Sequence, residues 1–159
     1  MCRLLVLCAA LVGCGAVSPA GQDGRATVVA VVDGDTVVVD VAGREERVRL
    51  IGIDTPEVHV DEGEQPDCFG PEASAFTKDL LAPGTAVRLV RDVVGRDDYG
   101  RLLAYVSLAG GRMVNELIVA AGFATPLSIP PNTAHAARFV AAARSAEAAD
   151  LGLWGACGG

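Results

Sequence analysis

Asp33-Gly34-Asp35-Thr36 lies between two valine-rich runs, and Arg49-Leu50-Ile51-Gly52-Ile53-Asp54-Thr55-Pro56-Glu57 follows about a hairpin's length later. The valine-rich runs predict β-strands, and the Asp-Gly pair between them predicts a tight turn. Together the two stretches put two carboxylates that can hold a hard metal ion beside an arginine that can bind a phosphate. A third carboxylate remains as a candidate base.

The hydrophobic pattern around these stretches predicts five short strands and three helices. The strands are expected at residues 26–32, 36–41, 46–53, 86–93 and 102–108, and the helices at 72–81, 114–123 and 136–149. Five strands with a helix between the third and the fourth suggest an α+β fold, a Greek-key barrel of the oligonucleotide-binding (OB) type. The strand count alone also fits other small barrels.

The N-terminal residues form a predicted export signal and do not enter the fold. Arg3 precedes an apolar run at residues 4–12, much shorter than the roughly 18 residues that indicate a membrane-spanning helix. Leu11-Val12-Gly13-Cys14 resembles a bacterial lipobox, in which the cysteine is lipidated and becomes the new N-terminus. The alternative is ordinary secretion after cleavage at a small residue such as Ala20. The expected segments are a signal peptide (1–13), a flexible tether (14–25), one domain (26–155) and a tail (156–159).

Length and charge restrict the class of protein. A chain of 159 residues suits a single domain with one hydrophobic core. The formal net charge of −7 argues against a general nucleic-acid binder that works by counterion release over a basic surface. A nuclease tolerates this acidity if positive charge is concentrated in its cleft and a cation bridges to the substrate.

Export also accounts for the cysteines. Cys2 and Cys8 leave with the signal and Cys14 carries lipid, so that Cys68 and Cys157 remain. Two cysteines in an oxidising compartment suggest one disulfide, and the alternative is a pair of free thiols. In the chain-entropy model a loop of this length stabilises the fold by roughly 4–5 kcal/mol, less any strain.

The spacing of the acids and the arginine sets a geometric condition. If the second hairpin turns at residues 42–43, Arg49 is a near neighbour of Asp35 across the strand ladder. Asp54 lies five residues beyond Arg49, an odd separation that points the two side chains to opposite faces of a flat strand. A bulge near Gly52, or departure from the strand, is needed for both to reach one cleft.

Each motif alone has an ordinary structural explanation. Asp33-Gly34-Asp35 occurs in hairpin turns with solvated acids, and Asp54-Thr55-Pro56-Glu57 occurs in turns and helix caps. Arg49 alone is a strand residue that extends from a barrel into solvent. His59 and His135 have no ligand partners at useful spacing and are interpreted as structural or surface residues.

The motifs in combination resemble the staphylococcal (thermo)nuclease family. Asp98-Tyr99-Gly100-Arg101 supplies a second arginine at the start of a strand, in the order that the family has. Gly70-Pro71-Glu72-Ala73-Ser74-Ala75-Phe76-Thr77-Lys78 and Met113-Val114-Asn115-Glu116 also resemble that family. The resemblance runs from about residue 26 to 154 and supports the OB barrel.

Ligand type and the resemblance together assign roles to the acids. Asp35 and Asp54 offer hard oxygens suited to calcium, and the Thr55 carbonyl is expected to add a third. Since calcium takes six to eight oxygens, water and a substrate phosphate must complete the set. Glu57 is the candidate to orient or deprotonate the attacking water.

The arginines are expected to bind the phosphate. Arg49 and Arg101 can pair with phosphate oxygens and stabilise charge in the transition state. Tyr99 is the expected aromatic partner for a base. In the resembled family the product carries a 3′-phosphate and a free 5′-hydroxyl. The chain is therefore expected to be an exported, lipid-anchored or secreted, monomeric Ca²⁺-dependent nuclease that cuts DNA and RNA with little sequence specificity.

Two departures and two rival functions stay open. Thr125-Pro126-Leu127-Ser128-Ile129 stands where the family's best-known member has pocket tyrosines, and the loop at residues 58–67 is acidic where that member's loop is lysine-rich. The first rival is a non-catalytic OB-fold lipoprotein that binds nucleic acid or protein. The second is a cell-envelope binding lipoprotein with an acidic calcium loop and no nucleic-acid role.

Overall fold

The computed structural model describes residues 24–58 and 65–157 of the chain. The predicted signal peptide, the predicted lipidation residue Cys14, His59 and most of the acidic loop lie outside the described residues. Within the described ranges, no helix has the length and apolar character needed to cross a membrane.

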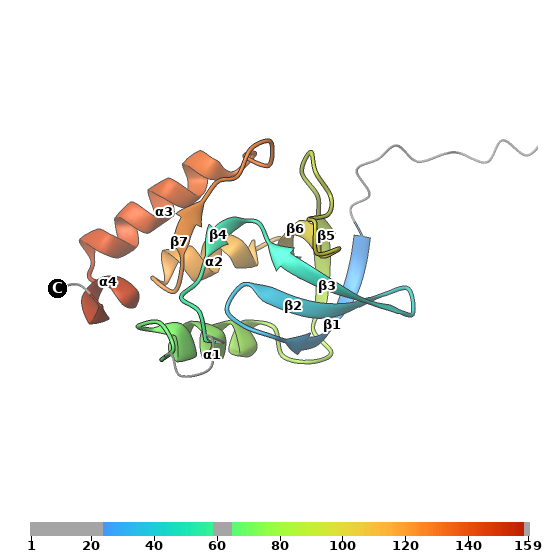
Figure 1. The fold of residues 1–159 in the computed structure, drawn as a ribbon, viewed down its shortest axis with the longest axis horizontal. Helices are drawn as coiled ribbons and strands as arrows, with labels where there is room; N and C mark the ends of the chain where they lie inside the picture. The colour runs from blue at the N-terminus through green and yellow to red at the C-terminus, as the bar shows by residue number, and fades with distance from the viewer. Residues whose placement is uncertain (1–23, 59–64, 158–159) are drawn as a thin grey trace, which may run out of the picture.

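Five strands close a barrel, as the sequence predicts. They are β1 (Gly24–Val31), β2 (Thr36–Val41), β3 (Arg44–Leu50), β6 (Leu102–Leu108) and β5 (Ala86–Val90), in that order around the barrel (Figure 1). All neighbouring pairs are antiparallel except β3 and β6, which run parallel. The barrel interior is aliphatic because alternate residues such as Val37, Val39, Val48 and Leu50 are fully buried.

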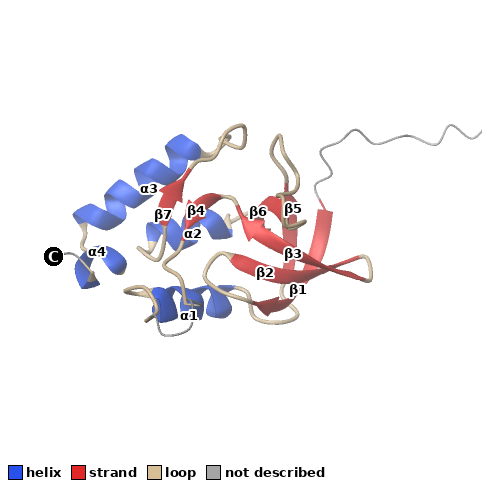
Figure 2. Ribbon diagram, in the orientation of Figure 1, coloured by secondary structure: helices blue, strands red, loops and turns tan. Residues whose placement is uncertain are grey.

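The remaining elements gather at one end of the barrel, away from the tip of the β2–β3 hairpin (Figure 2). They are the helices α1 (Gly70–Leu80), α2 (Val114–Ala120), α3 (Ala136–Ala148) and α4 (Leu153–Ala156), and a two-stranded sheet of β4 (Gly52–Asp54) and β7 (Thr125–Leu127). The first three helices correspond to the predicted ones, and α1 lies between the third and fourth barrel strands as expected. The sequence did not predict β7 or α4.

Several predicted boundaries are wrong, for local reasons. The strand expected at residues 46–53 is divided into β3 and β4 because Gly52 has a positive φ of 83°, which interrupts the extended backbone. The strand expected to reach residue 93 ends at Val90, since Asp92 turns to accept a hydrogen bond from the Tyr105 hydroxyl (3.0 Å). β1 begins at Gly24, so residues 24–25 belong to the barrel and not to the tether.

Two long-range links attach α1 to its surroundings. Thr77 on α1 donates its hydroxyl to the Gly34 carbonyl at 2.7 Å, and this buried bond joins the helix to the β1–β2 turn. The predicted disulfide is present: Cys68 and Cys157 are joined with an S–S distance of 2.03 Å across a separation of 89 residues. The bond ties the segment before α1 to the residue that follows α4.

Candidate functional site

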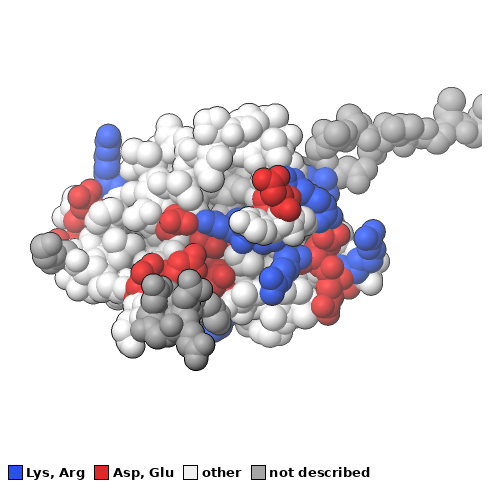
Figure 3. Space-filling view, in the orientation of Figure 1, with Lys and Arg blue, Asp and Glu red and all other residues white. Residues whose placement is uncertain are grey.

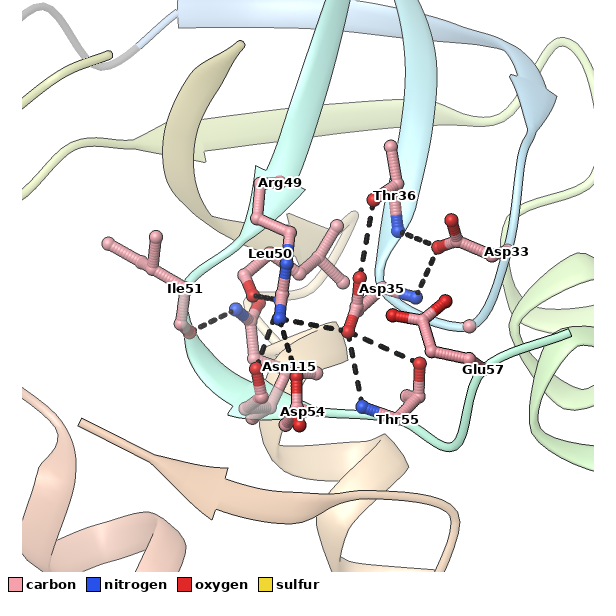
Figure 4. Close-up of polar contacts among 12 residues, drawn as sticks. Asp33, Asp35, Thr36, Arg49, Leu50, Ile51, Asp54, Thr55, Glu57 and Asn115 are labelled. Carbon is pink, nitrogen blue, oxygen red and sulfur yellow. Dashed lines mark hydrogen bonds and ion pairs between the residues drawn. The ribbon is translucent and has the colours of Figure 1, made fainter. Parts of the chain in front are cut away.

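The β1–β2 turn directs Asp35 into the protein. The Asp33 carboxylate accepts hydrogen bonds from the backbone N–H of Asp35 (3.1 Å) and of Thr36 (2.7 Å), which closes the turn. Asp35 is 5% exposed, and its Oδ2 accepts from both the backbone N–H (3.1 Å) and the hydroxyl (3.2 Å) of Thr55. Figure 4 shows the Asp35 carboxylate between the Arg49 guanidinium and Thr55.

Strand register brings Arg49 to the same place. Thr36 pairs with Arg49 across β2 and β3, so Arg49 is a near neighbour of Asp35, which confirms the predicted register. One guanidinium nitrogen, Arg49 Nη2, lies 3.0 Å from Asp35 Oδ2 and 2.9 Å from Asp54 Oδ1. The other, Nη1, donates to the Leu50 and Ile53 carbonyls at 2.7 and 2.9 Å. One arginine therefore holds two backbone carbonyls and two carboxylates together.

The break at Gly52 lets Asp54 reach this arginine, as the odd spacing requires. A Cβ atom at Gly52 would lie 2.5 Å from Phe139 Cε2, so the chain turns in direct contact with the buried ring on α3. Asn115 on α2, which is fully buried, donates to the Ile51 carbonyl (2.9 Å) and accepts from the Val106 N–H (2.9 Å). The turn between β3 and β4 is thus fixed from two helices.

The carboxylates of Asp35 and Glu57 have raised pKa values. Burial raises the pKa of Asp35 from 3.8 to about 6, against the opposing effects of the Arg49 charge and the Thr55 N–H, while the charges of Asp33 and Asp54 add to the rise. Burial also raises the pKa of Glu57, again with the help of Asp33 and Asp54. The Glu57 carboxylate points toward Asp35 in Figure 4. Excess negative charge in this cluster favours binding of a cation.

The arrangement fits a metal ion through two converging oxygens. The described residues contain no preformed group of three or more His, Cys, Asp or Glu side chains suited to a metal. Asp35 Oδ2 and Asp54 Oδ1 nevertheless face one positive atom, Arg49 Nη2, at about the same distance. Asp35 and Asp54 therefore offer two carboxylate oxygens of the kind that a hard divalent cation prefers.

Arg101 lies in a separate part of the same face. Its Nε donates to Asp97 Oδ2 at 2.7 Å, and its guanidinium carbon lies 5.4 Å from the centre of the Tyr99 ring. Tyr99 is 86% exposed. Arg49, Tyr99 and Arg101 line one groove of about 400 Å³, and Leu127 and Ile129 also line it.

A second hollow of about 330 Å³ is lined by Asp54, Thr55, Glu57 and Asp67. The Arg49–Asp54 ion pair connects this acidic hollow to the basic groove. Figure 3 shows an acidic area meeting a basic band on one face of the molecule. Of the predicted site residues, Arg49, Tyr99 and Arg101 therefore line one depression, and Asp54, Thr55 and Glu57 line the other. Asp35 lines neither and is buried beside Arg49 and Thr55.

Three contributing residues were not predicted as part of the site. Asp33 closes the turn, Asn115 fixes the β3–β4 break and Asp67 exchanges hydrogen bonds with the backbone of Glu57. The sequence signal for Asn115 was only the resemblance of residues 113–116. His135, interpreted as structural or surface, lies at the start of α3 with its ring 4.4 Å from that of Tyr105.

Comparison with known proteins agrees with this geometry. Residues 47–156 match the family model described as "Staphylococcal nuclease homologue". The chain is 42% identical over 125 residues to a thermonuclease of Staphylococcus intermedius, which covers 78% of this chain and 72% of that protein. It is 41% identical over 128 residues to a thermonuclease of Staphylococcus hyicus, covering 80% and 73% of the two chains. Endonuclease YncB of Bacillus subtilis is 33% identical over 129 residues, covering 80% of this chain and 60% of its own. The chain belongs to the staphylococcal nuclease family.

Proposed function

We propose that this protein is a calcium-dependent nuclease that hydrolyses phosphodiester bonds of DNA and RNA with low sequence specificity, leaving 3′-phosphate and 5′-hydroxyl ends. The observation that carries the proposal is the convergence of Asp35 and Asp54 on the Arg49 guanidinium. The two acids proposed to bind the metal are therefore in direct contact with the arginine proposed to bind the phosphate. The names of the relatives, thermonuclease and endonuclease, support the same activity.

Asp35, Asp54 and the Thr55 carbonyl are the residues that would hold calcium. When bound, the ion supplies Lewis-acid polarisation of a phosphoryl oxygen and helps to position a water. Thr55 keeps Asp35 in place through two hydrogen bonds to Oδ2. The Asp54 side chain is about half exposed, so it is the more accessible ligand.

Arg49 can serve the substrate without losing its position. Its Nη1 is held by two backbone carbonyls, Leu50 and Ile53, and these bonds do not depend on the carboxylates. Nη2 makes only the carboxylate contacts, so it is the donor that can pass to a phosphate oxygen. Asp97 holds Arg101 through its backbone N–H and Nε, whereas the Nη groups of Arg101 make no hydrogen bond within the described part of the chain.

Glu57 is the general base in this proposal. The residue is exposed, and its carboxylate makes no hydrogen bond to another of the described residues, which leaves it able to accept one from water. Burial and neighbouring acids raise its pKa, and a higher pKa strengthens a carboxylate as a base. Tyr99 is the stacking surface for a base. The aliphatic wall at Leu127 and Ile129 is expected to weaken base stacking in comparison with tyrosines.

We also propose export, with Cys14 as a lipid anchor on the outer face of the membrane, or secretion as the alternative, and a monomeric state. The Cys68–Cys157 disulfide supports an oxidising compartment. Cys14→Ser should release the protein from membranes or block its maturation. A mature N-terminus near Gly21 without lipid would contradict the anchor.

The activity is tested with single-stranded DNA and RNA, in calcium and in chelator. The wild type should cut only with calcium, Asp35→Ala should lose calcium binding and cutting, and Arg101→Ala should turn over much more slowly. Glu57→Gln should cut about 10²–10⁴-fold more slowly because the base is removed.

The matched controls are Glu147→Gln and Arg144→Ala, which replace exposed residues of α3. Both should cut at the wild-type rate. If folded wild type in calcium cuts neither substrate, the non-catalytic binding lipoprotein takes the place of the enzyme.

A further inference from the structure

Asp67 and Glu57 exchange two hydrogen bonds. The backbone N–H of Glu57 donates to the Asp67 carboxylate, Oδ2, at 3.0 Å, and the backbone N–H of Asp67 donates to the Glu57 carbonyl at 3.0 Å. The two residues are ten positions apart, so the pair closes the loop between them. The Asp67 carbonyl also accepts from the N–H of Gly70, the first residue of α1, at 3.0 Å. Asp67 is thus attached to the helix on one side and to Glu57 on the other.

The segment that carries Asp67 is fixed independently at the next three residues. Cys68 is bonded to Cys157, which follows α4. Phe69 stacks on Phe123, with ring centroids 5.1 Å apart. Gly70 lies so close to Glu57 that an added Cβ would be 2.4 Å from the Glu57 carbonyl oxygen. The backbone of Glu57 is therefore set by this segment.

Glu57 needs such support because its own side chain has little. Its carboxylate is exposed and makes no hydrogen bond to another described residue, so the position of the backbone decides where it points. Glu57, Asp67, Cys68 and Cys157 line the same hollow as the proposed calcium ligand Asp54. The disulfide thus forms part of the wall of the acidic hollow.

We infer that Asp67 is a positioning residue for Glu57 and that the Cys68–Cys157 disulfide holds Asp67 in that role. The inference rests on the proposed function, since positioning matters only if Glu57 acts on the substrate. A direct metal-binding role for Asp67 fits less well, because its Oδ2 is already bonded to the Glu57 N–H. The disulfide, whose two cysteines are 89 residues apart in sequence, then affects catalysis as well as stability.

The first test compares Asp67→Ala with Asp67→Asn. Alanine removes the acceptor for the Glu57 N–H, while asparagine keeps an oxygen at the same place. Asp67→Ala should lower kcat on the order of 10- to 10²-fold, the scale of a small misplacement of a catalytic group, with KM and calcium affinity little changed. Asp67→Asn should recover most of the loss. Asp79→Ala, an exposed acid on α1, is the control and should match the wild type.

A second measurement does not depend on catalysis. Amide hydrogen exchange at Glu57, followed by NMR in calcium-free protein, should speed up in Asp67→Ala and stay slow in Asp67→Asn. An unchanged exchange rate at Glu57 in Asp67→Ala would overturn the inference that the Asp67 carboxylate holds the Glu57 backbone. Faster exchange across the whole barrel would show general destabilisation and would also overturn a specific positioning role.

The double variant with Glu57→Gln separates positioning from a structural role. If Asp67 acts through Glu57, Asp67→Ala should cause no further loss of kcat in the Glu57→Gln background. The same loss in both backgrounds overturns the inference while leaving the proposed nuclease intact. A wild type that does not cut in calcium overturns both.

The disulfide is tested with the double variant Cys68→Ala/Cys157→Ala, assayed well below its melting temperature and checked by circular dichroism. Its kcat should fall, as that of Asp67→Ala does. Adding Asp67→Ala to the cysteine double variant should lower kcat little further. A variant that melts earlier but turns over at the wild-type rate when folded overturns the role of the disulfide in positioning.

Discussion

Asp35→Asn should stabilise the metal-free protein at neutral pH. Asp35 is 5% exposed, and its pKa rises from 3.8 to about 6 because burial outweighs the attraction of Arg49. A rise of this size corresponds to about 3 kcal/mol, at about 1.4 kcal/mol for each pH unit. Asparagine has nearly the same shape, remains uncharged and can still accept from the Thr55 N–H, so it avoids the cost of burying the charge.

The sign of the effect gives a defined pH window. Well below pH 3.8, Asp35 is protonated in both the folded and the unfolded chain, so the two proteins should be equally stable. As pH rises, the unfolded chain loses the proton near 3.8 and the folded protein near 6, so folding becomes less favourable over this range. Well above pH 6 the difference in the free energy of unfolding should stay constant, with the asparagine variant more stable by up to about 3 kcal/mol.

Urea unfolding in chelator, from pH 3.5 to 7.5, measures this difference. Asp79→Asn, an exposed carboxylate on α1, is the control and should track the wild type at every pH. Calcium should raise the stability of the wild type and not that of Asp35→Asn, because only the wild type binds it. If the variant is less stable than the wild type at pH 7 in chelator, the Arg49 ion pair outweighs burial and the reasoning is refuted.

Three other substitutions test the framework and the groove. Thr77→Val removes the donor to the buried Gly34 carbonyl and should lower the free energy of unfolding by about 1–3 kcal/mol in urea; no loss would mean that the bond contributes nothing. Gly34→Ala places a Cβ 2.5 Å from Thr55 Oγ1, so calorimetry should find weaker calcium binding, and unchanged affinity would contradict the contact. Tyr99→Ala should leave the melting temperature unchanged, since the ring is 86% exposed, but raise KM for single-stranded DNA by the equivalent of about 1–3 kcal/mol. An unchanged KM would argue against stacking on Tyr99.

Local patterns in the sequence were enough for most of the barrel. The predicted bounds of β2 and β6 agree with the structure, because β-branched alternation and flanking turns mark both ends of each strand. β4 and β7 were not separable by pattern: each has three residues, and β7 contains Pro126, which lowers the strand signal. The four-residue α4 is likewise too short for helical periodicity.

Of the contacts that form the site, those between residues close in sequence could be predicted and those between distant residues could not. The nearness of Arg49 to Asp35 could be derived from hairpin register, and the need for a break near Gly52 from odd spacing. The Asn115 bond to Ile51 spans 64 residues and the Thr77 bond to Gly34 spans 43, and no local pattern encodes such contacts. Pairing of Arg49 with both acids depends on the folded geometry as well.

Thr77, Asn115 and Asp67 support the site in the same way. Each side chain bonds to the backbone at a turn, at Gly34, Ile51 and Glu57 respectively, and none bonds to a proposed catalytic side chain. Backbone anchoring fixes the direction in which the acids and the arginine point but leaves their polar atoms available. Asp35 then bears the cost of burial beside a single arginine, which a bound cation would relieve. A rigid backbone around carboxylates that one arginine only partly neutralises is therefore the physical basis on which the proposed site would accept metal and phosphate without rearranging the barrel.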